Sequence, residues 1–230
     1  MIDDQGFLVH RRPFSDSRYQ VNFLTRDHGL VQGMLRTRTK DSSLHHFAET
    51  SLSWNDSKRL IFFSRYEINQ LSVLQGESLY AGMYLNELVT RTVHSDVVID
   101  GLFDVYRETI AELKDSTDLE PPLRNFERQL LKGLGFEIRF DYESSNDNPI
   151  QPQRKYRYVS ETGFTHLPND NSEGISGGDL LAVASHNYST MSARRTAKLV
   201  LQSALKPLLG EKPLLSRSLF DTTQVKVRKA

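Results

Sequence analysis

The sequence contains no cysteine, so the chain can form neither disulfide bonds nor thiolate metal sites, and it suits a reducing compartment. Long hydrophobic runs are also missing, because no apolar stretch approaches the ~18 residues that span a bilayer. The acidic start, Met1-Ile2-Asp3-Asp4, does not resemble a secretory signal. These absences indicate a soluble, intracellular protein that is not stabilised by cysteine chemistry.

Signatures of the common enzyme classes are missing as well. Gly210-Glu211-Lys212 resembles the end of a P-loop, but Leu205 stands where that loop requires glycine, and Pro213 replaces its serine or threonine. The pair His45-His46 and the nearby Glu49 lack a third histidine, which favours solvated loop histidines over a metal site. No nucleophile elbow, dinucleotide-binding or protein-kinase signature is present. We therefore expect a protein that acts by binding, with no catalytic residue, no cofactor and no metal.

Charge is balanced over the whole chain, with 29 Lys and Arg against 29 Asp and Glu, but it is not evenly spread. Residues 1–80 carry 10 basic and 9 acidic side chains, residues 81–150 carry 7 and 14, and residues 151–230 carry 12 and 6. The three segments therefore have formal charges of +1, −7 and +6. The more basic flanks are suited to meeting phosphate, and ordinary solvated charge is the alternative.

The first 76 residues have the pattern of short β-strands, because apolar side chains alternate there with polar ones. The alternating residues are Phe7, Val9, Tyr19, Val21, Phe23, Val31, Gly33, Leu35, Leu52, Trp54 and the run Leu60–Phe63. A turn at Arg26-Asp27-His28-Gly29 separates two of the runs, with Gly29 free to take a positive φ. Five short strands without a strong helix between them predict a small closed barrel over residues 1–76.

Beyond Gly76 the apolar spacing becomes helical, with side chains three and four residues apart. This spacing predicts three helices within residues 77–140. The third helix is opened by Pro121-Pro122 and capped near Gly135. Since none of these helices can bury its apolar stripe alone, we expect them to pack together.

Residues 141–178 are polar and loop-rich, with a short hairpin expected near residues 155–167. Helices return at about residues 179–186 and 192–209, within a second helical segment that covers residues 179–230. The expected fold class is therefore α+β, with an N-terminal β-barrel followed by a helical domain that contains a small loop-rich insert.

Several sequence blocks resemble the RecO family of recombination mediators, and they occur in the family's order over nearly the whole chain. The blocks are Gly6-Phe7-Leu8-Val9-His10-Arg11-Arg12-Pro13-Phe14, Phe23-Leu24-Thr25, His28-Gly29, Leu79-Tyr80-Ala81-Gly82-Met83-Tyr84-Leu85-Asn86-Glu87-Leu88, Leu123-Arg124-Asn125-Phe126-Glu127, Leu205-Lys206-Pro207-Leu208-Leu209-Gly210, Lys212-Pro213-Leu214 and Ser216-Arg217-Ser218-Leu219-Phe220. Each block is unspecific by itself, but their joint order is specific.

This resemblance implies an N-terminal OB-fold, a central helical domain and a small insert that is often a zinc finger. It also implies a DNA-repair role in the RecF pathway. The expected partners are single- and double-stranded DNA, the acidic C-terminal tail of single-strand binding protein, RecR and, indirectly, RecA. Whether a RecF partner exists is left open. The expected location is cytoplasmic and nucleoid-associated, with no membrane contact.

The sequence departs from the family pattern in two places. The insert has no cysteine, so it lacks a cysteine-based zinc site and its fold must rest on packing and loop hydrogen bonds. The stretch after Arg38 and Lys40 is also shorter than in the family, which shortens that basic loop.

Candidate DNA contacts lie at the ends of the predicted strands. Arg36, Arg38 and Lys40 follow a strand that is expected to end near Leu35, and the pair Arg11-Arg12 ends the first predicted strand. An OB-fold binds single strands with cations and aromatic platforms. The alternative for each of these residues is a solvated strand end.

Two further candidate sites lie in the helical part. Arg194, Arg195 and Lys198 crowd the first turns of the last predicted helix, where the helix dipole disfavours cations, and this suggests an external anion. Arg124 matches the family position associated with the tail of single-strand binding protein, and it precedes the apolar stripe Phe126, Leu130 and Leu131. A surface salt bridge of Arg124 to Glu120 or Glu127 is the alternative.

Two other functions stay open on the sequence alone. A general single-stranded nucleic-acid- or RNA-binding OB protein would lack the tail site. A nuclease or metal-dependent phosphotransfer enzyme would use acidic residues and Mg²⁺.

Overall fold

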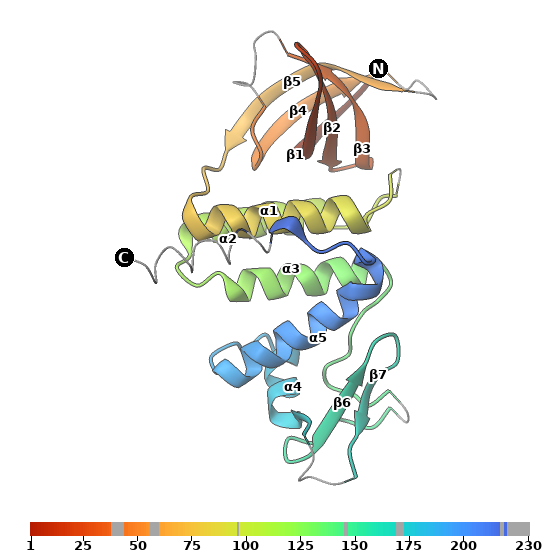
Figure 1. Ribbon diagram of the computed structural model, residues 1–230, viewed down its shortest axis with the longest axis vertical. Coiled ribbons are helices and arrows are strands. Elements are labelled where there is room, and N and C mark those ends of the chain that lie inside the picture. Colours follow the sequence, from red (N-terminus) through yellow and green to blue (C-terminus); the bar gives the residue numbers. More distant parts are fainter. Residues whose placement is uncertain are drawn as a thin grey trace. The chain divides into compact units, whose positions relative to one another are not determined.

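The computed structural model describes residues 1–37, 44–55, 60–95, 97–144, 147–168, 173–216 and residue 219 (Figure 1). They belong to two compact units. Unit 1 contains Met1–Leu119 and the C-terminal segment from Glu211, and unit 2 contains Glu120–Gly210. Unit 2 is thus an insertion in the sequence of unit 1. Its first residue lies inside the segment 77–140, which the sequence assigns to one helical part.

Unit 1 begins with five strands, β1 (Ile2–Ser15), β2 (Arg18–Thr25), β3 (Gly29–Arg36), β4 (Ala48–Trp54) and β5 (Ile61–Leu71). They close into a barrel in the order β1-β2-β3-β5-β4, seen at the N-terminal end of the chain in Figure 1. Strands β3 and β5 pair in parallel, and the other neighbouring strands pair antiparallel. The predicted OB-fold barrel and the α+β class are confirmed.

Alternation along β2 explains how the barrel is filled. Tyr19, Val21 and Phe23 are at most 5% exposed and belong to the barrel core. The turn predicted before β3 is also confirmed, because Gly29 has a φ of +67°. A Cβ at this glycine would lie 2.2 Å from the carbonyl oxygen of Val97, so the close approach of the two segments requires glycine.

Two helices follow the barrel in unit 1, α1 (Gly76–Thr92) and α2 (Leu102–Asp115). The middle of β1, residues 6–9, is buried on both faces between the barrel interior and these helices. Leu8 points into the barrel core, whereas the Phe7 ring centroid lies 5.2 Å from that of Phe103 and 5.0 Å from that of Tyr106. The helices therefore bury their apolar stripes against the barrel as well as against each other.

A buried polar network joins the barrel to these helices. The Tyr106 hydroxyl donates to Asn86 Oδ1 at 2.6 Å, and His46 Nδ1 lies 2.9 Å from the carbonyl oxygen of Leu8. Burial lowers the pKa of His46 below its ordinary value, and the nearby charge of Arg11 lowers it further. The interpretation of His46 as a solvated loop histidine is therefore wrong, because the side chain is part of the packed interior.

The C-terminal segment returns to unit 1 and is held by two side chains of α1. Arg91 donates to the carbonyl oxygens of Lys212, at 2.6 Å, and Pro213, at 3.2 Å. Glu87 accepts hydrogen bonds from the backbone N–H of Ser216 at 2.9 Å and from its hydroxyl at 2.7 Å. These bonds fix the chain after it leaves unit 2.

The described part of unit 2 consists of α3 (Glu120–Gly133), β6 (Lys155–Val159), β7 (Gly163–His166), β8 (Ile175–Ser176), α4 (Gly177–Ala184) and α5 (Met191–Leu209). The strands form a small sheet in the order β7-β6-β8, and the antiparallel pair β6–β7 confirms the predicted hairpin. Within the described ranges, no helix has the length and apolarity needed to cross a membrane.

The start and end of α3 follow from its sequence. Pro121 and Pro122 lie in its first turn, where a missing N–H costs no helical hydrogen bond. Gly135 takes a φ of +86° beyond its end, and the N–H of Phe136 reaches back to the carbonyl oxygen of Leu131 at 2.8 Å. The predicted helix start and glycine cap are both confirmed.

The loop-rich insert is organised around aromatic side chains. Phe140, Tyr156 and Phe164 are at most 1% exposed, and the ring centroids of Phe140 and Phe164 lie 5.5 Å apart. The Tyr156 hydroxyl accepts a hydrogen bond from the backbone N–H of Gln151 at 2.8 Å. Packing and loop hydrogen bonds thus hold together a segment that has no cysteine.

Candidate nucleic-acid interface

The outer surface of strands β1, β2 and β3 carries three exposed arginines. Tyr19 and Leu35 point into the barrel, so their neighbours Arg18 and Arg36 point outward. Arg18 and Arg36 are directly opposite each other in the β2–β3 ladder, and Arg12 lies on the same face of β1. Within the described ranges, none of the three forms an ion pair. We call Arg12, Arg18 and Arg36 the barrel arginine face.

Two exposed aromatic side chains accompany this face. Phe14 is 69% exposed at the end of β1, next to the β1–β2 hairpin turn. Phe62 of β5 is 54% exposed and pairs with Met34 of β3. Met34 is buried and lies opposite Gln20, which is opposite Arg12, so the row of positions that starts at Arg12 continues round the closed barrel to β5. Phe14 therefore lies on the same strand as Arg12, whereas Phe62 lies further round the barrel, on a strand that does not neighbour β1.

The predicted DNA contacts of the barrel do not all lie on one face. Arg12 and Arg36 belong to the barrel arginine face. Arg11 does not, because it faces the other side of β1, is partly buried and donates to the carbonyl oxygen of Leu44 at 3.1 Å. The first strand also continues to Ser15, so this pair of arginines does not end it. Arg38 and Lys40 lie outside the described residues.

Sequence reasoning missed three residues of this surface, Arg18, Phe14 and Phe62. A signal for Arg18 was present, because it directly precedes the inward series that starts at Tyr19 and so must face outward. No comparable signal identified the phenylalanines. An exposed ring and a core ring have the same place in an alternating pattern until the register is known.

A second cationic surface lies in unit 2, at a groove of about 490 Å³ beside β6, β8 and α5. Lys155, Arg157 and Arg195 line it, and in the described part of the chain none of them forms an ion pair. Two carboxylates, Glu173 and Asp179, also line the groove, which leaves a formal charge of +1. We call this surface the α5 groove. The two strand cations were missed from sequence, although the buried Tyr156 between them implied their outward direction.

The three predicted cations of the last helix are not equivalent. Arg195 lines the α5 groove, and Lys198 is exposed on α5. Arg194 is used internally, because its Nε donates to the carbonyl oxygen of Tyr188 at 2.6 Å and its guanidinium lies 3.8 Å from Glu120. Glu120 thus offsets part of the charge that is unfavourable at this end of the helix.

Arg124 is buried in α3 rather than exposed on its surface. Its guanidinium is 2.6 Å from the Glu127 carboxylate, and the two side chains are 7% and 0% exposed. The alternative of a salt bridge to Glu127 is therefore present, but as an internal pair. Phe126 and Leu130 are 0% exposed, so these side chains offer no surface to a partner in this structure. Their physical role here is packing.

A small pocket of about 160 Å³ lies one turn along the same helix. Arg128 and Lys132 supply cations to it, and Leu131, Ile138 and Leu201 supply apolar side chains. The Glu137 carboxylate also lines the pocket and lies 3.3 Å from Lys132 Nζ. His186 also lines this α3 pocket, where burial and then the charge of Arg128 lower its pKa and favour its neutral form. Leu131 is the one residue of the predicted apolar stripe that reaches a cavity described here.

No group of three or more His, Asp and Glu side chains is arranged as a metal site in the ranges that the structure describes. The cavities described above are instead distinguished by cations beside aromatic or apolar side chains. Such surfaces bind anionic groups by charge and shape and require no chemical step.

Comparison with known proteins identifies the family of the chain. The family model described as "Recombination protein O C terminal" matches residues 73–218. The DNA repair protein RecO of Pseudoalteromonas translucida (strain TAC 125) is 34% identical over 226 residues, which cover 96% of this chain and 97% of that protein. The proteins of the same name from Cellvibrio japonicus and Haemophilus influenzae (strain PittGG) are 35% and 36% identical over 223 residues, covering 94% of each chain. The chain belongs to the RecO family of DNA repair proteins.

Proposed function

We propose that this chain is a recombination mediator that binds single- and double-stranded DNA and anneals complementary strands. The observation that carries the proposal is the barrel arginine face, where three arginines without ion pairs among the described residues lie on neighbouring strands and exposed Phe14 follows Arg12 on β1. A second exposed ring, Phe62, lies on β5 of the same barrel. OB-folds bind single strands by this combination, in which cations neutralise phosphates and bases stack on aromatic rings. Each stacked base contributes about 1–3 kcal/mol.

Annealing follows from charge neutralisation and needs no catalytic group. Two complementary strands repel each other through their phosphates, and bound cations remove that repulsion so that base pairing supplies the driving force. The α5 groove supports this part of the proposal because it provides phosphate-binding cations in unit 2. One chain thus carries separate surfaces on two units, and each of them suits a nucleic-acid backbone.

We propose further that α3 holds the acidic C-terminal tail of single-strand binding protein. Arg124 matches the position that the family resemblance associates with this tail, and its buried Nε has no hydrogen-bond partner among the described residues. A buried donor without a partner is unusual, and an acceptor from the tail would reach it once the α3 surface around it opens. The neighbouring α3 pocket supplies Arg128 beside apolar side chains, the combination that holds a terminal carboxylate with a hydrophobic residue, whereas its Lys132 is paired with Glu137.

The roles of RecR and RecA in the proposal rest on family membership. A mediator must act on strands that single-strand binding protein already covers, and capturing the tail of that protein brings the mediator to them. We propose that this chain, together with RecR, then makes the strand available for RecA loading.

The proposal is tested by annealing complementary oligonucleotides that are precoated with the cognate single-strand binding protein. We expect the wild-type chain to accelerate pairing and the triple variant Arg12→Gln, Arg18→Gln, Arg36→Gln to lose most of this acceleration. Arg65→Gln is the matched control, because Arg65 lies on the same barrel but pairs with Glu67. Equal annealing by the triple variant and the control would contradict the assignment of the face.

Two further measurements, DNA cleavage with Mg²⁺ and binding of a tail peptide, distinguish the two alternative functions. A nuclease would cleave labelled DNA in the presence of Mg²⁺ instead of pairing it. A general single-strand binder would anneal bare oligonucleotides but would show no affinity for a peptide of the tail.

A further inference from the structure

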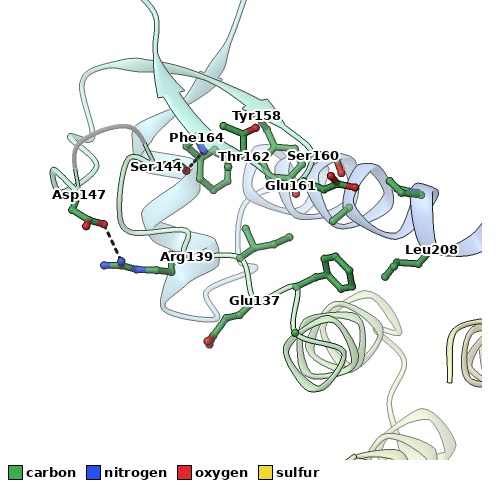
Figure 2. A pocket seen from close by; sticks show the side chains of 16 residues that line it. Glu137, Arg139, Ser144, Asp147, Tyr158, Ser160, Glu161, Thr162, Phe164 and Leu208 are labelled. Carbon is green, nitrogen blue, oxygen red and sulfur yellow. Dashed lines mark hydrogen bonds and ion pairs between the residues drawn. The ribbon is translucent and has the colours of Figure 1, made fainter. Parts of the chain in front are cut away.

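The largest cavity described in unit 2 lies between the β6–β7 hairpin, the loop after α3 and the end of α5 (Figure 2). Its volume of about 550 Å³ is within the range of ~300–1,000 Å³ typical of ligand sites. It does not share the cationic character of the α5 groove or the α3 pocket. We call it the hairpin pocket.

The apolar part of the hairpin pocket is held rigidly. Gly135 and Phe136 form the cap of α3, in which their N–H groups bond to the carbonyl oxygens of Lys132, at 3.0 Å, and Leu131, at 2.8 Å. The second residue of such a cap usually packs against its own helix, yet Phe136 is 43% exposed and lines the cavity. An apolar ring is therefore presented to solvent on a fixed backbone.

The opposite wall combines an aromatic pair with an unpaired carboxylate. The Tyr158 and Phe164 ring centroids lie 5.2 Å apart, and the Tyr158 hydroxyl has no hydrogen-bond partner in the described part of the chain. Glu161 lies at the hairpin tip with a φ of +65°, a conformation that is uncommon for a residue other than glycine. Figure 2 shows Glu161 grouped with Ser160 and Thr162 at this wall.

Charge distinguishes this pocket from the DNA-binding surfaces. Its lining contains Glu137, Asp147 and Glu161 against Arg139, a formal charge of −2. Arg139 is already bound to Asp147 at 3.0 Å, and Glu137 lies 3.3 Å from Lys132. Glu161 has no ion pair within the described residues, so a ligand cation has a free carboxylate to meet.

We propose that the hairpin pocket is a docking site for a basic peptide segment of a partner protein, with one large apolar side chain flanked by lysine or arginine. The apolar side chain packs between Phe136 and Leu208, and a flanking cation pairs with Glu161 and donates to the Tyr158 hydroxyl. A DNA backbone and an acidic tail are both repelled by the same lining. The site therefore goes beyond the proposed function, because it selects a partner of the opposite charge.

The test uses two fluorescein-labelled hexapeptides with a central Leu-Phe pair, one flanked by lysine pairs and the other by glutamate pairs. Fluorescence anisotropy of the full chain should show saturable binding of the lysine peptide, weakening as salt screens the charges, and no binding of the glutamate peptide. Glu161→Lys should lower the affinity roughly fivefold, and Phe136→Ala roughly tenfold. Glu112→Lys is the matched control, because it makes the same charge reversal at an exposed position of unit 1 and should leave the affinity unchanged.

Both pocket variants alter exposed side chains, and an unchanged melting temperature verifies that they fold. Equal binding of the two peptides would overturn the proposal, as would equal effects of the Glu161 and Glu112 reversals. Preferred binding of the glutamate peptide would assign the pocket to an acidic partner instead. DNA annealing by Glu161→Lys should equal that of the wild type, so the failure of this inference is distinguishable from failure of the proposed function.

Discussion

Replacing Arg124 with alanine leaves the Glu127 carboxylate in the interior of unit 2 without its cation. The two side chains are 7% and 0% exposed and their charged groups lie 2.6 Å apart, so removing Arg124 takes the nearest cation from a buried carboxylate. Removing one partner of a buried ion pair costs about 3–5 kcal/mol. Small domains have a total stability of about 5–15 kcal/mol, so Arg124→Ala should lose a large part of it. If the free energy of unfolding falls by about 2 kcal/mol per molar urea, this loss lowers the urea concentration at the unfolding midpoint by about 2 M.

A second variant separates stability from recognition. Arg124→Met combined with Glu127→Leu replaces the ion pair by apolar side chains, which is commonly neutral or stabilising. We expect this double variant to regain wild-type stability in urea unfolding followed by circular dichroism. We also expect it to bind a fluorescent tail peptide of single-strand binding protein about 10- to 100-fold more weakly, because the charge-assisted hydrogen bond from Arg124 is lost.

Three results would refute this reasoning at different steps. A loss of less than 1 kcal/mol in Arg124→Ala would show that the pair is solvated rather than buried. Full tail affinity in the stable double variant would show that Arg124 acts on the site through packing alone. An equal loss of affinity for naked DNA would make Arg124 a phosphate contact.

Three further predictions concern DNA affinity, pH and metal. Replacing Arg12, Arg18 and Arg36 with glutamine should reduce the slope of log affinity for single-stranded DNA against log salt concentration by about 2, because each lost phosphate contact contributes ~0.7. Anisotropy titrations measure this slope, and an unchanged slope would place the phosphate contacts elsewhere. Burial lowers the pKa of His46 from its ordinary 6.5, so the folded state favours the neutral ring. The contribution of the neutral ring to the free energy of unfolding is therefore fully present above pH 6.5, and it is lost as the pH falls through the lower pKa of the folded state. Urea unfolding should therefore show a smaller loss of stability between pH 7.5 and pH 5.5 in His46→Gln than in the wild type, and equal losses would exclude His46 as the cause. Elemental analysis of untagged protein should find far less than one zinc per chain, and EDTA should leave the melting temperature unchanged; stoichiometric zinc would show that the insert does not rest on its aromatic core alone.

Local periodicity was sufficient to predict the barrel, the hairpin and the helices, because each of them buries one face. The predicted inward residues Tyr19, Val21 and Phe23 are all in the barrel core. Strand β1 shows the limit of prediction from alternation. Phe7 and Leu8 are adjacent and both buried, since one faces the helices and the other the barrel. Alternation alone cannot indicate that both faces of a strand are covered.

The direction of the β1 arginines depends on an irregularity that the sequence does not reveal. The pairing of β1 with β2 shifts between Leu8 and His10, which moves the following residues to the other face. Arg12 consequently points outward, whereas Arg11 turns toward Leu44. A one-residue bulge thus decides which of two adjacent arginines is exposed on the outer face of β1.

The burial of Arg124 could have been predicted from helical spacing. Arg124, Glu127 and Leu131 lie at positions i, i+3 and i+7, so they share one side of α3 with part of its apolar stripe. A charge of each sign at two of these positions indicates an internal pair. The free Nε of Arg124 could not be predicted, because it depends on the orientation of one guanidinium in the folded chain.

Composition alone could not predict whether the barrel has a cationic face, because acidic and basic side chains lie at different points along the same strand. Asp3 and Asp4 lie at the start of β1, and Arg12 lies eight residues further along the same strand. At a rise of about 3.3 Å per residue this separation is roughly 25 Å, or about three Debye lengths at physiological salt. Asp3 and Asp4 therefore do not cancel the field at the barrel arginine face, and the carboxylate that lies near this face in the sequence is Asp16, in the turn two residues before Arg18. A chain whose formal charge is zero can still present a cationic face, so charge must be counted by face rather than by segment.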